Sequence, residues 1–268
     1  MQFTEPGTID DLVEDATAAG YRATSRLVHD WVSKGLLGKP QRRRTGPNGS
    51  EKALHSANQR FLFITLLRER VSTPRLSDLA SIPLGAWLYG GTEWVSTDQA
   101  LRALQTYVGD PRGTKAWARR IAASIMSVVD DPRLGTRDSR RELLEALVEA
   151  LYTGGFDRDL LLAKARPLFD PAHVLLTSAN AEDPDQTPRT PESLAFHLEI
   201  VIAAGQAIRA GALEPWELEA IRELENDAKD GNPTPEQFFG AASKLFRGVG
   251  VWVIMRRFKK SHDRPDGP

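Results

Sequence analysis

The most informative stretch of the chain is residues 26–68, RLVHDWVSKGLLGKPQRRRTGPNGSEKALHSANQRFLFITLLR. Its first part predicts a short amphipathic helix, because apolar residues recur there at helical spacing. The apolar face of this helix consists of Leu27, Val28, Trp31 and Val32. Thr24 or Ser25 can cap the helix at its start, and Gly35 stands where a glycine commonly ends a helix. We expect the next residues, Leu36 and Leu37, to turn back into the core.

Two further helices and a basic hairpin flank this segment. Upstream, residues 8–20 predict a first helix, with Thr8 as its cap and Asp11 close to a capping-box position. Downstream, Asn48-Gly49 is a strong turn signal between residues 40–44 and 50–55, and it predicts an exposed hairpin. A third helix is predicted from Ser56, and its inward side is assigned to Ala57, Phe61, Ile64 and Leu67. The predicted order is helix, short turn, helix, basic hairpin, helix.

Charge is distributed unevenly along the chain, although the net charge is only −1. Residues 20–70 contain 11 basic and three acidic residues, which is a net charge of +8. The remainder carries 24 basic and 33 acidic residues, which is a net charge of −9. A cationic segment on an acidic body is typical of a protein that binds a polyanion through that segment. A solvated basic surface would explain the charge alone equally well.

Residues 26–37, RLVHDWVSKGLL, together with the basic segment that follows them, resemble the winged helix-turn-helix of the MerR family. The matching positions are Trp31, Gly35-Leu36-Leu37, Pro40, Arg42-Arg43, Gly49 and the helix from Ser56. The resemblance covers about the first quarter of the chain and implies that the second helix reads bases while the wing contacts phosphates. The sequence departs from the family at His29, where an arginine is usual, and at His55, where a tyrosine is usual. Pro74 and Pro83 interrupt the region in which family members carry a long dimer helix.

The side of the second helix opposite its apolar face is the candidate DNA-contacting surface. Serine, arginine and histidine side chains can all bond to base edges or phosphates. The arginines of the hairpin are expected on phosphates, where their charge confers affinity and salt dependence. Two further candidates are Lys52, in the second half of the hairpin, and Arg60, in the third helix, and either could instead be an ordinary surface charge. The full candidate set is Ser25, Arg26, His29, Lys34, Arg42, Arg43, Arg44, Lys52 and Arg60.

The rest of the chain predicts helices separated by proline and glycine. These helices cover residues 76–80, 97–108, 114–129, 137–152, 157–168, 191–210, 215–229 and 235–260, the last with a break near Gly248 and Gly250. Strand-like runs are limited to Val174–Thr177 and Gly250–Met255, and residues 179–191 have the composition of a linker. The fold class is therefore mostly α. We expect a winged helix-turn-helix at residues 1–73, or extending to residue 110, a larger all-helical domain at 74–260, and a disordered tail at 261–268.

Several chemistries find no support in the sequence. The chain has no cysteine, which excludes disulfides and thiolate metal sites, and its five histidines do not pair at metal-ligand spacing. It contains neither a Gly-x-Ser-x-Gly elbow nor a phosphate loop ending in Gly-Lys-Ser/Thr. No apolar run approaches the ~20 residues that span a bilayer, and no secretory signal is evident. We therefore expect a cytoplasmic protein that is not an enzyme and uses no cofactor, metal or membrane.

These patterns favour a sequence-specific transcriptional regulator that binds double-stranded DNA. One such unit reads few base pairs, so a homo-oligomer on repeated half-sites is expected. The helical domain would supply oligomer contacts or bind a small-molecule or protein effector. The alternatives to a transcriptional regulator are a recombination or architectural DNA-binding factor and a helical protein-interaction module that does not bind DNA.

The predicted helix at residues 137–152 has one broad apolar side. This side is interpreted as domain core, or alternatively as a dimer seam, and it consists of Leu143, Leu144, Leu147, Val148 and Leu151.

Overall fold

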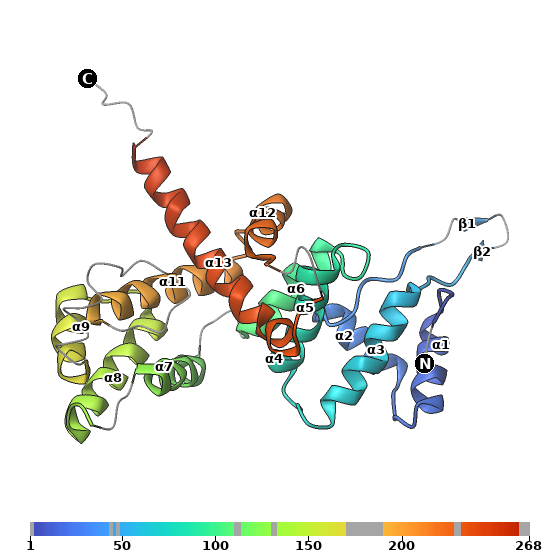
Figure 1. Cartoon of the computed structure of the whole chain (residues 1–268). Helices are drawn as coiled ribbons and strands as arrows, with labels where there is room; N and C mark the ends of the chain where they lie inside the picture. The colour runs from blue at the N-terminus through green and yellow to red at the C-terminus, as the bar shows by residue number, and fades with distance from the viewer. Residues whose placement is uncertain are drawn as a thin grey trace. The chain divides into compact units, whose positions relative to one another are not determined.

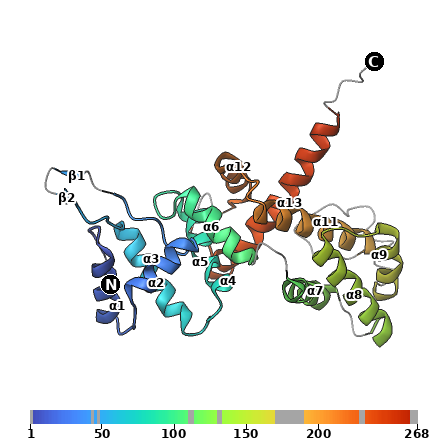
Figure 2. The same ribbon diagram turned by 180° about the vertical axis from the view of Figure 1, so that it is seen from behind.

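The structure, a computed structural model, is mostly α-helical (Figures 1 and 2). It describes residues 3–42, 45–46, 49–109, 114–129, 133–169, 190–227 and 232–262. The chain divides into two compact units, and each is assembled from two separate segments. Unit 1 comprises residues 1–109 and 212–248, and unit 2 comprises residues 110–211 and 249–268. The N-terminal basic region therefore belongs entirely to unit 1.

Unit 1 begins with three helices, α1 (Ile9–Ala18), α2 (Ser25–Ser33) and α3 (Ala57–Arg70). Thr8 and Asp11 form the expected capping box of α1. The hydroxyl groups of Thr24 and Ser56 accept hydrogen bonds from backbone N–H groups in the first turns of α2 and α3. The predicted starts of these helices are therefore confirmed. Both views show the three helices packed together near the N-terminus of the chain (Figures 1 and 2).

The remaining helices of unit 1 are α4 (Leu76–Leu79), α5 (Ser81–Gly90), α6 (Thr97–Val108), α12 (Pro215–Glu225) and the first part of α13 (Pro235–His262). Its core contains the fully buried rings of Trp31, Phe63 and Trp87. Trp87 belongs to α5, so this core extends beyond residue 73, and the first segment of unit 1 ends at residue 109, close to the alternative limit at residue 110. Helices α4 to α6 pack with α1 to α3 as one unit.

The inward side of α3 differs from the prediction, because only Leu67 of the four predicted residues is buried, Ala57 and Ile64 are half-buried, and Phe61 is exposed. This side chain is 45% exposed, and its ring meets the ring of Trp94 edge to face, with a centroid distance of 5.9 Å. The apolar side chains of α3 that are buried are Leu62, Phe63, Leu66 and Leu67. Apolar residues occupy most of the circumference of α3 between Phe61 and Leu67, so helical spacing alone could not identify the inward side.

Unit 2 contains α7 (Lys115–Val129), α8 (Arg137–Thr153), α9 (Arg158–Ala165), the short 3₁₀ helix η1 (Arg166–Leu168), α11 (Pro191–Arg209) and the remainder of α13. Helix α8 packs against α7, α9 and α11. Its apolar face is buried at Leu143, Leu147, Val148 and Leu151, and Leu144 is half-buried. The interpretation of this face as domain core is therefore confirmed.

The predicted break at Gly248 and Gly250 is wrong, because α13 runs without interruption from Pro235 to His262. The predicted strand at Gly250–Met255 is wrong for the same reason. A Cβ atom on Gly250 would lie 2.3 Å from the carbonyl oxygen of Ile200 on α11, so this glycine allows two helices to approach closely.

The remaining sequence predictions about this half of the chain fall largely outside the described residues. Ser261 and His262 belong to α13, so the predicted disordered tail does not begin at residue 261. Residues 263–268, the strand-like run at Val174–Thr177 and residues 179–189 of the expected linker lie outside the part that the structure describes.

Among the described helices, α13 is the one long and apolar enough, by length and composition alone, to cross a membrane. The qualifying segment is Pro235–Lys259, with a mean hydropathy of 1.3 and 33% of the 18-residue window buried. Core helices of soluble proteins meet the same criterion. Lys244 lies within this segment, and its ammonium group pairs with Asp227 at 2.9 Å.

Candidate nucleic-acid interface

Helix α2 is fixed in place at both of its ends. At its start, the hydroxyl oxygen of Thr24 accepts a hydrogen bond from the backbone N–H of Leu27 at 3.2 Å. At its end, the carbonyl of Lys34 accepts a hydrogen bond from the hydroxyl of Thr106 on α6 at 2.7 Å. Gly35 follows with a φ of +73°, and a Cβ atom there would lie 2.3 Å from the backbone nitrogen of Ala103. Only glycine therefore fits both the conformation and the space at the end of α2.

One side of α2 is buried in the core of unit 1. Val28 and Trp31 have no solvent exposure, and Leu36 and Leu37 beyond the helix are also fully buried, as the sequence predicts. The Trp31 ring meets the ring of Phe63 on α3 edge to face, with 5.5 Å between centroids. This packing holds the orientation of α2 about its own axis, and so determines which side chains face solvent.

The opposite side of α2 carries the predicted contact residues. Ser25, Arg26, His29 and Lys34 are all exposed. At 100° per residue, Arg26 and His29 lie on the side of the helix away from Val28 and Trp31, and Ser25 lies at the edge between the two sides. Arg26 makes no hydrogen bond or ion pair with any described residue. The acidic Asp30 is exposed on this side as well, next to His29.

The segment between α2 and α3 forms an antiparallel hairpin. β1 (Thr45–Gly46) pairs with β2 (Gly49–Ser50), in the register Thr45 to Ser50 and Gly46 to Gly49. An isolated bridge between Gln41 and Leu54 continues the same register, with backbone hydrogen bonds of 2.8 and 3.0 Å. The strand pair lies beyond the helices of unit 1 in both views (Figures 1 and 2). Apart from β1 and β2, the described residues form no strand, so the β-structure of the described part is limited to this two-stranded sheet.

The hairpin arginines are only partly described. Arg42 is exposed at the base of the hairpin, next to the Gln41 bridge. Arg43 and Arg44 lie outside the described residues, as do Pro47 and Asn48 of the predicted turn.

Two of the predicted contact residues are engaged in ion pairs within unit 1. Lys52 is exposed, and its ammonium group lies 2.7 Å from the Asp10 carboxylate on α1, a contact that raises the pKa of Lys52. Arg60 is more enclosed, with a side chain that is 17% exposed. Its Nε and Nη2 atoms each donate to the Asp15 carboxylate at 2.8 Å, and its Nη1 donates to the carbonyl of Glu5 at 3.0 Å. Arg60 therefore joins α3 to α1.

A buried polar network behind α2 was not predicted from the sequence. Gln59 on α3 accepts a hydrogen bond from the backbone N–H of Gly38 at 2.7 Å. The Gln59 amide nitrogen donates to the carbonyl of Trp94 at 2.7 Å and to the side-chain oxygen of Gln99 at 2.9 Å. Gln99 on α6 is fully buried and donates to the carbonyl of Leu36. The network links the segment after α2 to both α3 and α6, and its partners are 21 to 63 residues apart.

His55 closes the base of the hairpin. Its backbone exchanges two hydrogen bonds with Gly7, at 2.8 and 2.9 Å, which tie the N-terminal segment to the start of α3. The imidazole is 1% exposed, and neither ring nitrogen has a hydrogen-bond partner among the described residues. Burial, with a smaller contribution from the charge of His29, lowers the pKa of His55 to about 4. The ring is therefore neutral at pH 7.

None of the protein families, curated proteins or solved structures compared with this chain matches it. Within the described residues, no three histidine or acidic side chains are grouped so that they could hold a metal ion. The interpretation of the site therefore rests on its geometry and charge.

Proposed function

We propose that residues 8–70 form a winged helix-turn-helix that binds double-stranded DNA, and that the protein is a sequence-specific transcriptional regulator. In this proposal α2 enters the major groove and β1–β2 is the wing. The observation that carries the proposal is the division of α2 into two sides. Val28 and Trp31 anchor one side in the core, while Arg26 and His29 face solvent on the other, with Ser25 exposed at the edge.

The residues have separate roles in this proposal. Arg26 and His29 project from a rigidly held helix, which suits hydrogen bonding to base edges. Arg42 and the arginines that follow it supply charge for the phosphate backbone, which confers affinity without sequence information. Arg60 and Lys52 already pair with Asp15 and Asp10, so we assign neither of them a primary role in DNA contact, and we assign only the enclosed Arg60 to holding α3 against α1.

A homo-oligomer belongs to the same proposal, because a single recognition helix covers only a few base pairs. Unit 2 would then provide oligomer contacts or bind an effector. The net charge of +8 between residues 20 and 70 supports a polyanionic partner for unit 1.

The test is selection of bound sequences from a random double-stranded DNA library, followed by titration of the selected site. Arg26→Ala is compared with Arg119→Ala, which removes the same charge from an exposed position on α7 in unit 2. We expect wild type and Arg119→Ala to enrich a common motif, and Arg26→Ala to weaken binding by about tenfold or more, since a lost base contact costs roughly 1–3 kcal/mol. If no motif is enriched, or if binding is weak and indifferent to salt, a protein-interaction module becomes the better interpretation.

A further inference from the structure

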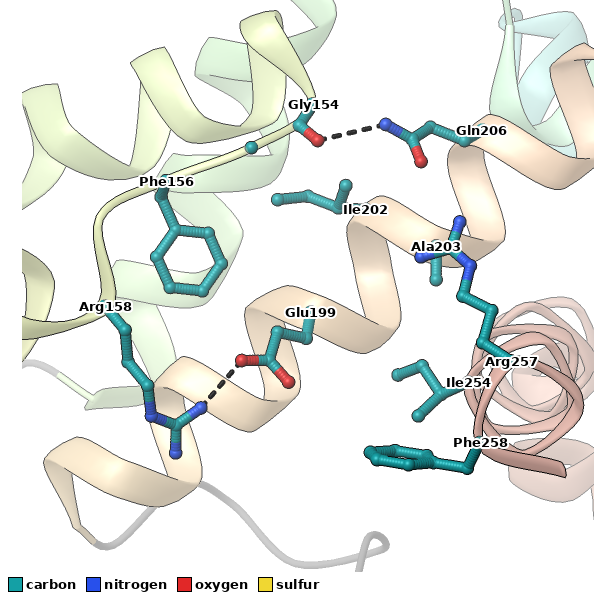
Figure 3. Close-up of a pocket in the computed structure, with 11 residues that line it drawn as sticks. Gly154, Phe156, Arg158, Glu199, Ile202, Ala203, Gln206, Ile254, Arg257 and Phe258 are labelled. Carbon is teal, nitrogen blue, oxygen red and sulfur yellow. Dashed lines mark hydrogen bonds and ion pairs between the residues drawn. The ribbon is translucent and has the colours of Figure 1, made fainter. Parts of the chain in front are cut away.

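Unit 2 contains a cavity of about 530 Å³, within the range that small-molecule sites occupy. Three segments line it: the turn after α8, one face of α11 and one face of α13 (Figure 3). The α11 residues are spaced i, i+3, i+4 and i+7, and the α13 residues i, i+3 and i+4, so each helix presents one continuous face. The lining side chains used below are Phe156, Arg158, Glu199, Ile202, Ile254 and Arg257.

The walls of the cavity are mainly apolar. Phe156 and Ile254 are half-buried, and Ile202 is 8% exposed. Figure 3 shows these side chains on three sides of the hollow, with Phe258 beside Ile254 on α13. An apolar ligand body placed here would remove these surfaces from water, which is the usual source of affinity in such sites.

The charges around the cavity leave one cation in excess. The Arg158 guanidinium lies 2.6 Å from the Glu199 carboxylate, so these two charges neutralise each other. Arg257 forms no ion pair or hydrogen bond with any other described residue. Its guanidinium extends from α13 toward α11 (Figure 3). A carboxylate can accept paired, charge-assisted hydrogen bonds from a guanidinium, which gives Arg257 a natural partner.

The turn that lines one side of the cavity is held in place by a hydrogen bond. Gln206 on α11 donates from its side-chain amide to the carbonyl of Gly154 at 3.0 Å. A Cβ atom at position 154 would lie 2.5 Å from that amide nitrogen, so a side chain there would displace it. The contact fixes the turn that carries Phe156 against α11. This part of the lining is therefore tied to α11 without a ligand, which lowers the cost of ordering it on binding.

From these features we infer that unit 2 binds a small amphipathic carboxylate, with its apolar body against Phe156, Ile202 and Ile254 and its carboxylate on Arg257. This inference goes beyond the proposed DNA binding and does not depend on it, because the binding can be measured on the free protein. In a regulator, such a site would be the place where an effector acts.

Isothermal titration calorimetry of the full chain with octanoate tests the inference, with octanamide and octylammonium as neutral and cationic probes of the same length. We expect one octanoate per chain, with binding at least about tenfold tighter than for either control, because a charge-assisted hydrogen bond contributes roughly that factor. Arg257→Gln should weaken octanoate binding by about tenfold. Arg257→Lys should restore much of it, since the charge is kept.

Arg256→Gln is the matched control, because Arg256 precedes Arg257 on α13 and does not line the cavity. It should leave octanoate binding unchanged, and circular dichroism of each variant should show the same helical content. The inference is overturned if octanoate does not bind by about 10 mM, since a preformed site of this kind should reach millimolar affinity. It is also overturned if the three probes bind alike, or if Arg257→Gln binds octanoate as wild type does.

Discussion

Arg60 and Asp15 form a two-bond ion pair between α3 and α1, with both N–O distances at 2.8 Å and both side chains less than a fifth exposed. Enclosed pairs of this geometry behave differently from surface pairs, because removal of one partner leaves the other charge without compensation. The same unit contains an exposed pair, Lys52 and Asp10, which allows a direct comparison.

Arg60→Ala should therefore destabilise unit 1 by about 2–4 kcal/mol, as expected for breaking an enclosed ion pair. Lys52→Ala should leave the unfolding midpoint nearly unchanged. Urea denaturation followed by circular dichroism measures both effects, and a cycle with Asp15→Ala isolates the coupling between the two side chains. Equal effects of Arg60→Ala and Lys52→Ala would contradict the structural role assigned to Arg60.

The buried amide pair behind α2 predicts a second stability effect. Gln99→Leu removes the partner of Gln59 and of the Leu36 carbonyl, so buried polar groups lose their hydrogen bonds. The expected cost is about 2 kcal/mol. Gln105→Leu, at an exposed position of the same helix, is the control and should change stability by less than about 0.5 kcal/mol. A comparable loss in both variants in chemical denaturation would show that the network does not stabilise the fold.

Two glycines with similar φ angles should lose different amounts of stability when each is replaced by alanine. Gly20 has a φ of +83° and open space where a Cβ atom would lie, so Gly20→Ala should cost only the conformational strain, about 1 kcal/mol. Gly35 has a φ of +73°, and its Cβ would also overlap the backbone of α6. Gly35→Ala should therefore lower the thermal unfolding temperature much more than Gly20→Ala. Similar shifts for the two variants would refute the close contact between Gly35 and α6.

The fold should lose stability in mild acid because of His55. Its pKa is about 4 in the folded protein and near 6.5 when unfolded, so between these values the unfolded chain binds more protons. The neutral His55 side chain makes its full contribution to the free energy of unfolding above pH 6.5. This contribution falls as pH decreases toward 4. The loss between pH 8 and pH 5 should be about 2 kcal/mol.

His55→Leu removes the titrating group and so isolates this contribution. Urea unfolding at pH 8 and pH 5 should show a smaller pH dependence in the variant than in wild type, while carboxylates contribute equally to both. An unchanged difference between the two pH values would mean that His55 is not a buried neutral imidazole.

The sequence predicted those features of unit 1 that depend on neighbouring residues. Thr8, Thr24 and Ser56 cap helices because their hydroxyl groups reach backbone N–H groups only three residues away. The apolar face of α2 followed from helical spacing, and Trp31 is buried as expected.

Features that depend on distant contacts were not predictable in this way. The partner of Arg60 is 45 residues away, so its charge looked available for DNA. Gly250 resembled a helix breaker because the approach of Ile200 could not be seen in the sequence. Gln59 and Gln99 had no local signal at all, since amides are common on exposed helix faces. Each unit is assembled from two separate segments of the chain, and this arrangement also depends on contacts between residues that are far apart in the sequence.

The central claim is that α2 reads bases and the hairpin arginines bind phosphates. The most direct measurement is base-resolved binding of wild type, Arg26→Ala and Arg42→Ala to variants of the selected DNA site at several salt concentrations. The account predicts that Arg26→Ala relaxes discrimination at one or two positions, whereas Arg42→Ala weakens all sequences alike and reduces the salt slope by about 1. Sequence preference that survives Arg26→Ala intact, with a salt slope unchanged in Arg42→Ala, would contradict it.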